Sequence, residues 1–344
     1  MTKGHACVLG ATGQVGRAAV RALVEDGWEV TAASRRGARD GAWPVEVRSV
    51  GVDRNEQGAL EAALGDGCDV LVDIVAYDGA HGRQLTGLAD RIGSAVVISS
   101  GAVYEDERGR GFDTQDEPDG FPAYPVPIPE SWRTVAPGDG TYGTRKRALE
   151  RELLAAGEAL PTTVVRAGAI HGLHCAGPRE LWFVKRALDG RPVRLLAYDG
   201  ASRFHPVHAD NLGELIRLAA AKPGSRVVNG ADPQAPTVAE IGRAIDAVMG
   251  VESETVLISG PPEGTVGLTP WTGAHPVVYG MTGAERELGY RPVVSYEESL
   301  PATVEWLTGR LAVQDWREAF PGLVKYPVDL FDYAAEDAWL AARA

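Results

Sequence analysis

The first 100 residues alternate short apolar runs with helix-like segments, and this alternation constrains the fold more than any other feature. The apolar runs are "HACVLG", "WEVTAAS", "VEVRSVGVD", "CDVLVDIVAY" and "SAVVISSG", and the helix-like segments are "VGRAAVRALVEDG", "NEQGALEAALGDG" and "RQLTGLADRIG". Strands that alternate with helices of about 10–13 residues form βαβ units, whose parallel strands are covered by helices on both faces. The sequence therefore predicts an α/β fold with a doubly wound parallel sheet.

The rest of the chain departs from this alternation. A chain of 344 residues exceeds the size at which one core usually stops growing, so we expect two lobes. Residues 105–140 are rich in Pro, Gly and acidic residues, which is typical of a functional lid or of a disordered segment. Beyond residue 172 the pattern is irregular and aromatic-rich, and "TVAEIGRAIDAVMG" has a capping-box start at Thr237 and Glu240. We expect a smaller second lobe there and a final helix in "DYAAEDAWLAARA".

Composition excludes several classes of partner. The net charge of −13 repels phosphate backbones and anionic lipids, so we expect no nucleic-acid partner and no membrane partner. The three cysteines, Cys7, Cys68 and Cys175, indicate reduced thiols rather than a disulfide framework. The chain runs from its first residues directly into a strand-like segment, which leaves no room for a signal peptide. We therefore expect a cytoplasmic protein.

A glycine-rich turn, "VLGATGQVGRAAV", joins the first strand to the first helix. Gly10, Gly13 and Gly16 would allow a tight turn, a close approach of backbone to a pyrophosphate, and close packing of the helix on the sheet. The amides at a helix N-terminus then face the phosphate charge. A tight βα turn without a ligand is the alternative, but the strand–turn–helix context favours dinucleotide binding.

The end of the second strand bears on the choice between NADP and NAD. NAD sites usually place a carboxylate there for the ribose 2′-hydroxyl, whereas this chain has Ser34, Arg35 and Arg36. Two guanidinium groups suit a 2′-phosphate, so we predict NADP in preference to NAD, with two solvated surface arginines as the alternative. Asp53, after the third strand, is a candidate acceptor for the adenine amino group.

Several motifs in order resemble one enzyme superfamily. The segments "GATGQVG", "GVDRN", "VVISSGAVY", "YGTRK", "VVRAGAIHG", "RFHPVHADNLGEL" and "MTGAERELGYRPVVSYEESLPATVEWL" resemble the extended short-chain dehydrogenase/reductase superfamily, and within it the NAD-dependent epimerase/dehydratase group, over roughly residues 5–308. The resemblance implies a seven-stranded Rossmann-like sheet with a smaller C-terminal substrate-binding lobe. It also implies a homodimer through the helices at residues 83–92 and 141–156.

These motifs give the expected domains and cofactor contacts. We expect a dinucleotide-binding domain in residues 1–170 with a return segment at about 203–230, a substrate lobe in 171–202 and 231–330, and a helical tail in 331–344. The predicted cofactor contacts are Gly10, Thr12, Gly13, Gln14, Val15, Gly16, Ser34, Arg35, Arg36, Asp53, Val75, Ala76, Ser99, Tyr142, Lys146 and Ala169.

The segment "TYGTRKRALE" places Tyr142 and Lys146 four residues apart. The resemblance assigns Tyr142 as the catalytic acid/base, Lys146 as its partner, and Ser100 as the residue beside the reacting carbonyl. Residues i and i+4 share one helix face, so the ammonium can approach the phenol. A cation about 4 Å away would stabilise the phenolate by roughly 4 kcal/mol and bring its pKa to about 7. An incidental pair on an exposed helix is the alternative.

Residues at which this chain differs from the family reduce the number of reactions that we expect it to catalyse. The dehydratases carry an Asp-Glu pair after the serine position, where this chain has Gly101 and Ala102, so elimination of water lacks its usual acid and base. The family's phosphate-binding arginine is out of register at Arg203. Arg179 and Lys185 are alternative anion contacts, with solvated helix residues as the other interpretation of both. The predicted substrate contacts are Tyr77, Ser100, His171, Arg179, Trp182, Arg203 and Trp271. Two His-x-x-His pairs, at 171/174 and 205/208, raise the question of a metal, which hydride chemistry does not need; we expect none.

Three functions remain open. The first is an NADP(H)-dependent oxidoreductase acting on a ketone or secondary alcohol of a sugar-nucleotide-like or secondary-metabolite substrate. The second is a nucleotide-sugar epimerase with tightly bound NAD(P). The third is a non-catalytic nucleotide sensor or RNA-binding relative, because "DVLVDIVAYDG" and "GPRELWFVKRALDGRP" resemble chloroplast stem-loop-binding proteins.

Overall fold

The computed structural model describes residues 2–343, which form two compact units. Of the described residues, unit 1 comprises 2–168, 209–231 and 279–293, and unit 2 comprises 169–208, 232–278 and 294–343. Residues 279–293, which we expected in the smaller lobe, belong to unit 1 because their helix packs against the last strand of its sheet. The expected return segment is also shorter, since it begins at residue 209 rather than at 203.

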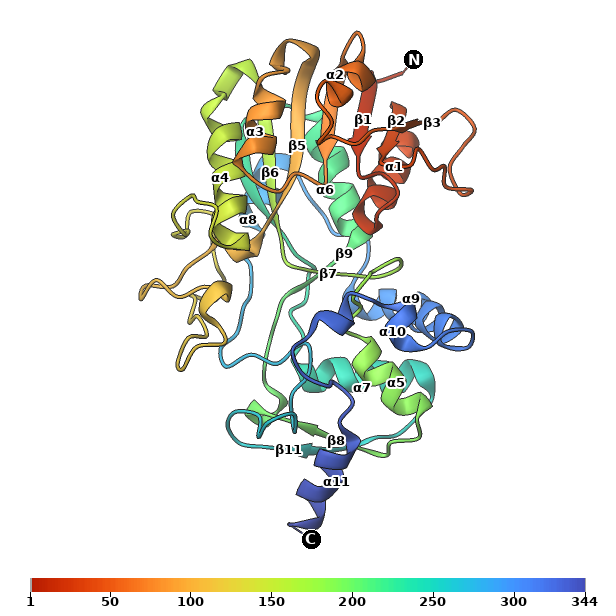
Figure 1. The fold of residues 1–344 in the computed structure, drawn as a ribbon, viewed down its shortest axis with the longest axis vertical. Coiled ribbons are helices and arrows are strands. Elements are labelled where there is room, and N and C mark those ends of the chain that lie inside the picture. The colour runs from red at the N-terminus through yellow and green to blue at the C-terminus, as the bar shows by residue number, and fades with distance from the viewer. Residues whose placement is uncertain (1, 344) are drawn as a thin grey trace. The chain divides into compact units, whose positions relative to one another are not determined.

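Unit 1 is built on one parallel sheet of seven strands (Figure 1). The strands are β1 (His5–Leu9), β2 (Glu29–Ser34), β3 (Arg48–Gly51), β4 (Cys68–Asp73), β5 (Ile92–Ser100), β6 (Thr162–Ala167) and β10 (Arg226–Gly230). Their order is β10-β6-β5-β4-β1-β2-β3, and Ala6 of β1 lies opposite Val30 of β2 and Val70 of β4. The strand order reverses between β1 and β4, and such a switch point opens a crevice at the carboxyl ends of the strands.

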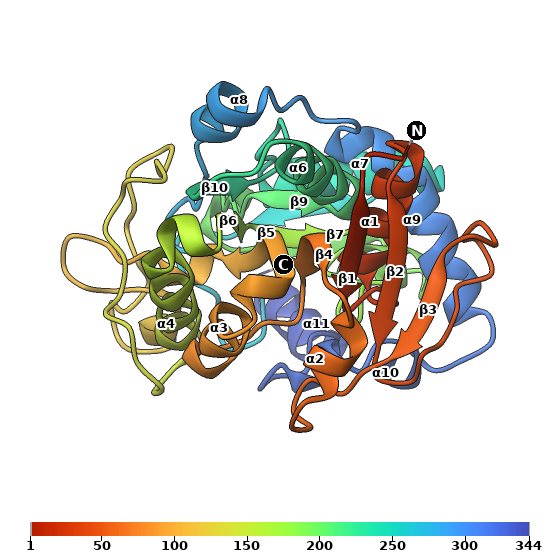
Figure 2. The same ribbon diagram turned by 90° about the horizontal axis from the view of Figure 1, so that it is seen from above.

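Helices cover both faces of this sheet, as Figure 2 shows. On one face α1 (Gln14–Glu25) packs against α6 (Ala209–Ala221), and α8 (Thr282–Leu288) contacts α6 and β10. On the other face α2 (Ala59–Leu64), α3 (Gly79–Thr86) and α4 (Tyr142–Ala155) bury leucines against Cys7, Leu71 and Val97 of the inner strands. The predicted doubly wound, Rossmann-like α/β fold is confirmed.

Residues 105–140, which belong to unit 1, are held largely by hydrogen bonds between side chains and backbone within the segment. The Tyr124 hydroxyl donates to the Tyr104 carbonyl at 3.0 Å, and the Trp132 indole donates to the Glu105 carbonyl at 2.9 Å. The Asp106 carboxylate accepts hydrogen bonds from the amides of Arg108, Arg110 and Ala123. These bonds give an irregular segment a defined path without a long regular element.

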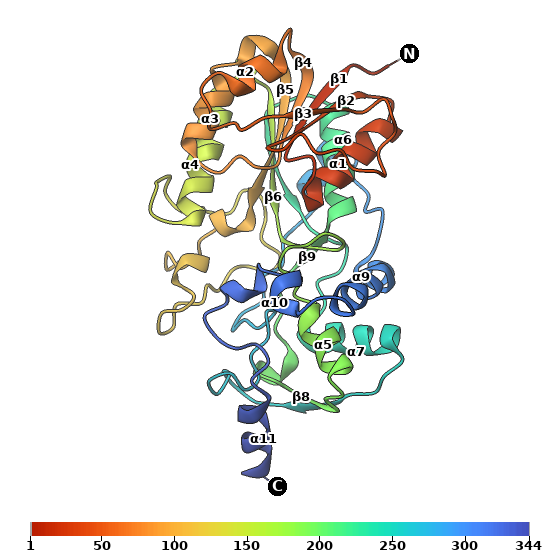
Figure 3. The same cartoon turned by 45° about the vertical axis from the view of Figure 1, so that its right-hand side comes forward.

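Unit 2 has its own core, built on helices and two short sheets (Figure 3). The strands β7 (Ala169–His171) and β9 (Pro206–His208) pair in parallel, as do β8 (Val193–Leu196) and β11 (Glu254–Leu257). The helices are α5 (Leu181–Leu188), α7 (Val238–Met249), α9 (Tyr296–Leu311), α10 (Trp316–Ala319) and α11 (Tyr333–Ala341). Leu181, Ile241 and Leu300 represent the contributions of α5, α7 and α9 to the core. Within residues 2–343, every helix is too short or too polar to cross a membrane.

Candidate functional site

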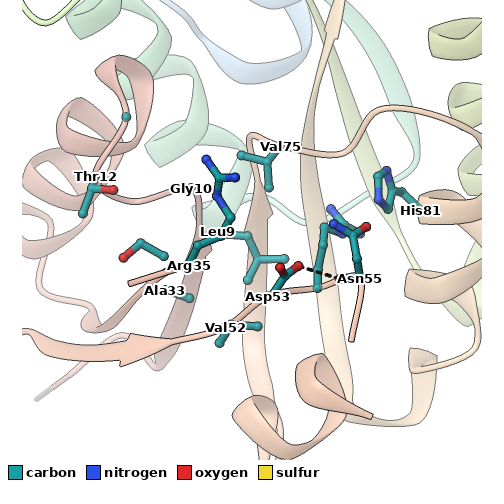
Figure 4. Close-up of a pocket in the computed structure, with 13 residues that line it drawn as sticks. Leu9, Gly10, Thr12, Ala33, Arg35, Val52, Asp53, Asn55, Val75 and His81 are labelled. Carbon is teal, nitrogen blue, oxygen red and sulfur yellow. Dashed lines mark hydrogen bonds between the residues drawn. The ribbon is translucent and has the colours of Figure 1, made fainter. Parts of the chain in front are cut away.

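A cavity of about 400 Å³ lies at the carboxyl ends of four parallel strands of unit 1 (Figure 4). The loops that follow β1, β2, β3 and β4 all contribute to its wall. The lining residues are Leu9, Gly10, Thr12, Gly13, Ala33, Ser34, Arg35, Val52, Asp53, Arg54, Asn55, Val75 and His81. The cavity therefore occupies the switch-point crevice, where open parallel sheets bind their ligands.

Two glycines of the first turn are required by the backbone that forms this wall. Gly10 has a φ of +84°, a conformation that other residues rarely adopt. A Cβ on Gly16 would lie 2.1 Å from the Gly10 carbonyl oxygen, so a side chain there would push α1 away from the turn. Gly13 lines the cavity and precedes α1 without providing a side-chain cap, and the amides at a helix N-terminus suit a phosphate. The turn has the features that a pyrophosphate site needs.

The end of β2 presents polar groups to the cavity. The Ser34 hydroxyl is buried and, within the part of the chain that the structure describes, has no hydrogen-bond partner. Arg35 is exposed and lines the cavity, and Figure 4 shows its side chain extending along the wall that carries Gly10. Arg36 is also exposed but does not line the cavity. An unpartnered hydroxyl and a guanidinium group fit the ribose and phosphate end of a dinucleotide.

Ser100, Tyr142 and Lys146 lie close together in unit 1. Ser100 ends β5, where its Oγ accepts from the Ala102 amide at 3.2 Å, and its hydroxyl is close enough to the Tyr142 phenol to lower the pKa of that phenol. Thr141 caps α4, so Tyr142 is the first residue of that helix and Lys146 lies one turn further on. The Lys146 ammonium is 5.9 Å from the centre of the Tyr142 ring. The three residues predicted from the resemblance therefore share one neighbourhood.

The expected effect of Lys146 on the phenol is wrong in this structure. Tyr142 is 43% exposed, but partial burial of its phenol raises its pKa. The neighbouring Ser100 hydroxyl lowers this pKa in part, and Tyr77 raises it further. The Lys146 ammonium donates instead to the carbonyl oxygens of Ala76 at 2.6 Å and Ile98 at 3.0 Å. Because backbone carbonyls hold the ammonium, it does not contact the phenol, and the predicted lowering of the Tyr142 pKa to about 7 is not seen.

Lys146 itself is strongly perturbed. The residue is 5% exposed, and burial lowers the pKa of its ammonium from 10.5 to about 8. The carboxylates of Asp73 and Glu150 oppose this change, and the Arg54 guanidinium adds to it. A buried amine that titrates near neutral pH, next to a tyrosine, is typical of a functional site.

The predicted cofactor contacts divide into two groups. Gly10, Thr12, Gly13, Ser34, Arg35, Asp53 and Val75 line the cavity, whereas Gln14, Val15, Gly16, Arg36, Ala76, Ser99, Tyr142 and Lys146 lie in unit 1 outside its wall, and Ala169 belongs to unit 2. Sequence reasoning missed Leu9, Ala33, Val52, Arg54, Asn55 and His81. Arg54 and Asn55 directly follow Asp53, so the motif "GVDRN" already contained a signal for them. His81, in α3, had none.

The predicted substrate contacts lie in both units. In unit 1 the Tyr77 ring is 5.8 Å from the Tyr142 ring. In unit 2 the Arg179 guanidinium lies over the rings of Phe204 and Trp271, at 5.1 and 5.4 Å from their centres, and Arg203 is exposed. Trp182 and Trp271 are core residues of unit 2. The assignment of these residues as substrate contacts stays a prediction.

The histidines of unit 2 surround a buried carboxylate. His171 Nε2 is 2.6 Å from Asp232 Oδ2, and the His208 amide donates to Asp232 Oδ1 at 2.7 Å. His205 Nε2 is 2.8 Å from the Asp232 carbonyl oxygen. Among residues 2–343, no three His, Cys, Asp or Glu side chains are grouped so that they could hold a metal ion.

Comparisons with known proteins agree with this geometry. The model of the NAD dependent epimerase/dehydratase family matches residues 6–231. No curated protein matches the chain at a significant level.

Solved structures with the same fold include three sugar-nucleotide complexes. UDP-glucose 4-epimerase with UDP-glucose from Thermotoga maritima is 20% identical, with a TM-score of 0.67, over 89% of this chain and 99% of that one. UDP-N-acetylglucosamine 4-epimerase from Methanobrevibacter ruminantium M1, in complex with UDP-N-acetylmuramic acid, is 17% identical, with a TM-score of 0.68, over 90% and 100%. MoeE5 in complex with UDP-glucose and NAD is 20% identical, with a TM-score of 0.65, over 90% and 100%. The chain thus belongs to the NAD dependent epimerase/dehydratase family and is an NAD(P)-dependent enzyme of the extended short-chain dehydrogenase/reductase type.

Proposed function

We propose that this enzyme is an NADP(H)-dependent oxidoreductase acting on a ketone or secondary alcohol of a sugar-nucleotide-like or secondary-metabolite substrate. The observation that carries the proposal is the arrangement of Ser100, Tyr142 and Lys146 in the same unit as the switch-point cavity. The choice of NADP rests on Arg35, which lines that cavity and, within residues 2–343, has no ion-pair partner. A guanidinium without a carboxylate partner suits a 2′-phosphate.

Each residue of the set has a role that follows from its position. Tyr142 exchanges a proton with the substrate oxygen, and Ser100, whose hydroxyl lowers the pKa of the phenol, donates to the same oxygen. Lys146, held by the Ala76 and Ile98 carbonyls, keeps a positive charge beside the nucleotide and the phenol below a pH of about 8. The nicotinamide group, when bound, supplies or accepts the hydride. Proton and hydride transfer together interconvert ketone and alcohol.

Gly101 argues against elimination of water at this site. A Cβ at position 101 would lie 2.0 Å from the Tyr279 hydroxyl oxygen, and Tyr279 is itself buried. The space in which a dehydratase would carry its acidic side chain is therefore filled by a tyrosine in this chain. The site keeps the proton donor for oxidation and reduction and lacks the pair for dehydration.

A nucleotide-sugar epimerase with tightly bound NAD(P) is the second candidate, favoured by the printed ligands of the solved structures with this fold. The two candidates differ in net turnover of the cofactor. Native mass spectrometry of the purified protein followed by incubation with UDP-glucose separates them. A retained nucleotide with conversion of the sugar supports epimerisation, whereas an exchangeable NADPH that is consumed with a ketone supports reduction.

The two arginines after β2 provide a matched pair for testing the cofactor. We expect Arg35→Asp to weaken NADPH binding by at least about tenfold and to leave NADH binding within about threefold, because only the 2′-phosphate loses a charge-assisted contact. Arg36→Asp, which makes the same charge change outside the cavity wall, should weaken NADPH binding far less. Titration by nucleotide fluorescence measures both. Equal losses for NADPH and NADH in Arg35→Asp would contradict the proposed phosphate site.

We further propose a cytoplasmic homodimer that associates through the faces of α3 and α4. The three free cysteines support a reducing compartment, and the family resemblance supports the pairing of these helices. Light scattering coupled to size exclusion measures the mass in solution, and a monomer at micromolar concentration would rule the dimer out.

A further inference from the structure

A buried ion pair lies between the cavity and Lys146. Arg54 follows Asp53 in the cavity wall, and its Nη1 donates to Asp73 Oδ2 at 2.5 Å. Asp73 is the last residue of β4 and is fully buried, and Arg54 is 8% exposed. A buried ion pair is costly to form, so its presence at this place calls for a reason beyond stability.

Asp73 uses its other oxygen to hold the loop after β4. Its Oδ1 accepts hydrogen bonds from the Val75 amide at 3.0 Å and the Ala76 amide at 2.8 Å. The carbonyl of the same Ala76 accepts from the Lys146 ammonium at 2.6 Å. One short loop therefore connects the Asp73 carboxylate to the lysine.

Arg54 is fixed on its other side by Gln84 of α3. The Gln84 Oε1 accepts from Arg54 Nε at 3.1 Å and from Nη2 at 2.8 Å, and Gln84 Nε2 donates to the Arg54 carbonyl at 2.7 Å. Two nitrogens of the Arg54 guanidinium are thus held by one Gln84 oxygen, the Gln84 amide is itself held by the Arg54 backbone, and the oriented guanidinium pairs with Asp73. Such planar, multiply bonded contacts give a single geometry.

We infer that Arg54 and Asp73 are positioning residues that link the nucleotide cavity to Lys146, because their ion pair fixes the loop of residues 74–76 whose carbonyl holds the ammonium. The inference rests on the proposed function, in which Lys146 acts beside Tyr142. Neither residue touches the reacting atoms. They act through the Ala76 carbonyl and through their own charges.

The charges around Lys146 determine in which direction its pKa should change in each variant. Asp73 at the end of β4 and Glu150 in α4 raise the pKa of Lys146, whereas Arg54 lowers it; His81 in α3 also faces this group, and Tyr142 lies one turn away. Arg54→Gln should therefore raise the pKa of Lys146 from about 8 toward about 9, and Asp73→Asn should lower it toward about 7. Mere loosening of the structure would admit water and raise the pKa in both variants.

The measurement is a pH titration of lysine side chains by NMR with ¹³Cε-labelled lysine. The chain contains only Lys3, Lys146, Lys185, Lys222 and Lys325, so five signals are to be assigned, and Lys146→Met identifies the relevant one. Opposite changes in the two variants support the inference. Changes of the same sign, or no change, would overturn it.

A second readout is the binding of NADPH. We expect Arg54→Gln to weaken it about tenfold because the wall at Asp53 and Asn55 loses its support, and Arg54→Lys to recover part of the loss. Gln84→Leu, which leaves the buried ion pair and both of its charges in place, should weaken NADPH binding by a smaller amount than Arg54→Gln and should leave the pKa of Lys146 nearly unchanged. This milder variant keeps the inference testable if Arg54→Gln does not fold.

Arg217→Gln is the matched control. Arg217 also forms ion pairs in unit 1, with Glu214 and Asp26, but it has no contact with the loop of residues 74–76. It should leave the Lys146 titration and the NADPH affinity unchanged. The titration needs neither substrate nor nucleotide, so its result does not depend on NADPH binding. A wild-type protein that binds no NADPH would refute the proposed function alone.

Discussion

Lys146 shows at the scale of one residue how burial and function compete. A lysine on a helix surface would keep its charge at little cost, whereas here burial lowers the pKa of the ammonium to about 8. The two carbonyls that hold it replace only part of the lost water. The site therefore contains a cation that the protein tolerates at a cost in stability, which is expected where position matters more than stability.

This cost gives a prediction for stability against pH. Between pH 8 and 10.5 the unfolded chain holds the lysine proton and the folded chain has released it, so the free energy of unfolding rises with pH. Lys146→Met lacks the group, so the stability of the wild type relative to this variant should increase by about 2 kcal/mol from pH 7 to pH 9.5. Urea unfolding at four pH values measures the difference. A constant or decreasing difference would show that the folded-state pKa is not lowered.

The same residue marks the limit of sequence reasoning about the site. The spacing of Tyr142 and Lys146 predicts a shared helix face, and the structure brings both residues together with Ser100. The partners of the ammonium are backbone carbonyls from the ends of two other segments, Ala76 and Ile98. No periodicity in the sequence specifies such contacts, because they depend on how β4 and β5 lie beside α4.

At the scale of elements, local signals predict where helices begin when a cap is present in the sequence. Thr237 and Glu240 form the expected capping box at the start of α7. The helix expected at residues 83–93 instead begins at Gly79, because the Asp78 side chain accepts from the amides of Ala80 and His81. Its glycines are weak helix formers, but a Cβ on Gly82 would lie 2.8 Å from Glu152 Cβ, so close packing on α4 selects glycine there.

The strand expected in "TTVVRAGAIHG" shows the opposite case. The structure divides it at Gly168 into β6, which joins the seven-stranded sheet, and β7, which pairs with β9. The apolar pattern continues through the break, so it contains no signal for the change of partner. The Gly168 amide donates to the Gly230 carbonyl at the end of β10, a contact between residues 62 positions apart that only the folded chain defines.

The capping box of α7 yields a prediction for this element. The Thr237 hydroxyl accepts from the Glu240 amide at 3.2 Å, and Glu240 Oε2 accepts from the Thr237 amide at 2.7 Å. We expect Thr237→Ala to lower the free energy of unfolding by about 1 kcal/mol, because the Glu240 amide loses its acceptor and the Glu240 carboxylate loses the hydroxyl that donates to it. Thr237→Ser keeps the hydroxyl and is the matched control. Equal losses in both variants, measured by urea unfolding at pH 7, would assign the effect to the methyl group instead.

At the scale of the whole molecule, the parallel sheet covered by helices follows from the sequence, whereas the buried ion pairs do not. The pairs Arg54–Asp73, Arg166–Glu150 and Arg186–Glu336 join residues 19, 16 and 150 positions apart. The sequence around each of these six residues does not show whether the charge is buried or solvated. These charges become buried only when the segments that carry them pack together in the folded units.

The last of these pairs attaches the end of the chain to unit 2. Arg186 of α5 donates to both carboxylate oxygens of Glu336 in α11, at 2.8 and 2.5 Å, and both residues are buried. The next residue, Asp337, pairs with Arg191 at the surface, where its side chain is 59% exposed. Two adjacent acids of one helix thus pair with arginines in two different environments.

These neighbours provide a direct comparison of buried and exposed pairing. Glu336→Ala leaves the Arg186 charge buried without a partner, so we expect it to destabilise unit 2 by about 3–5 kcal/mol. Asp337→Ala removes an exposed partner and should cost less than about 1 kcal/mol. The double variant Arg186→Met with Glu336→Ala should recover much of the loss, since no uncompensated charge remains. Urea unfolding together with hydrogen exchange in α5 and α11 measures all three, and similar losses for Glu336→Ala and Asp337→Ala would mean that the carboxylate of Glu336 is solvated rather than buried.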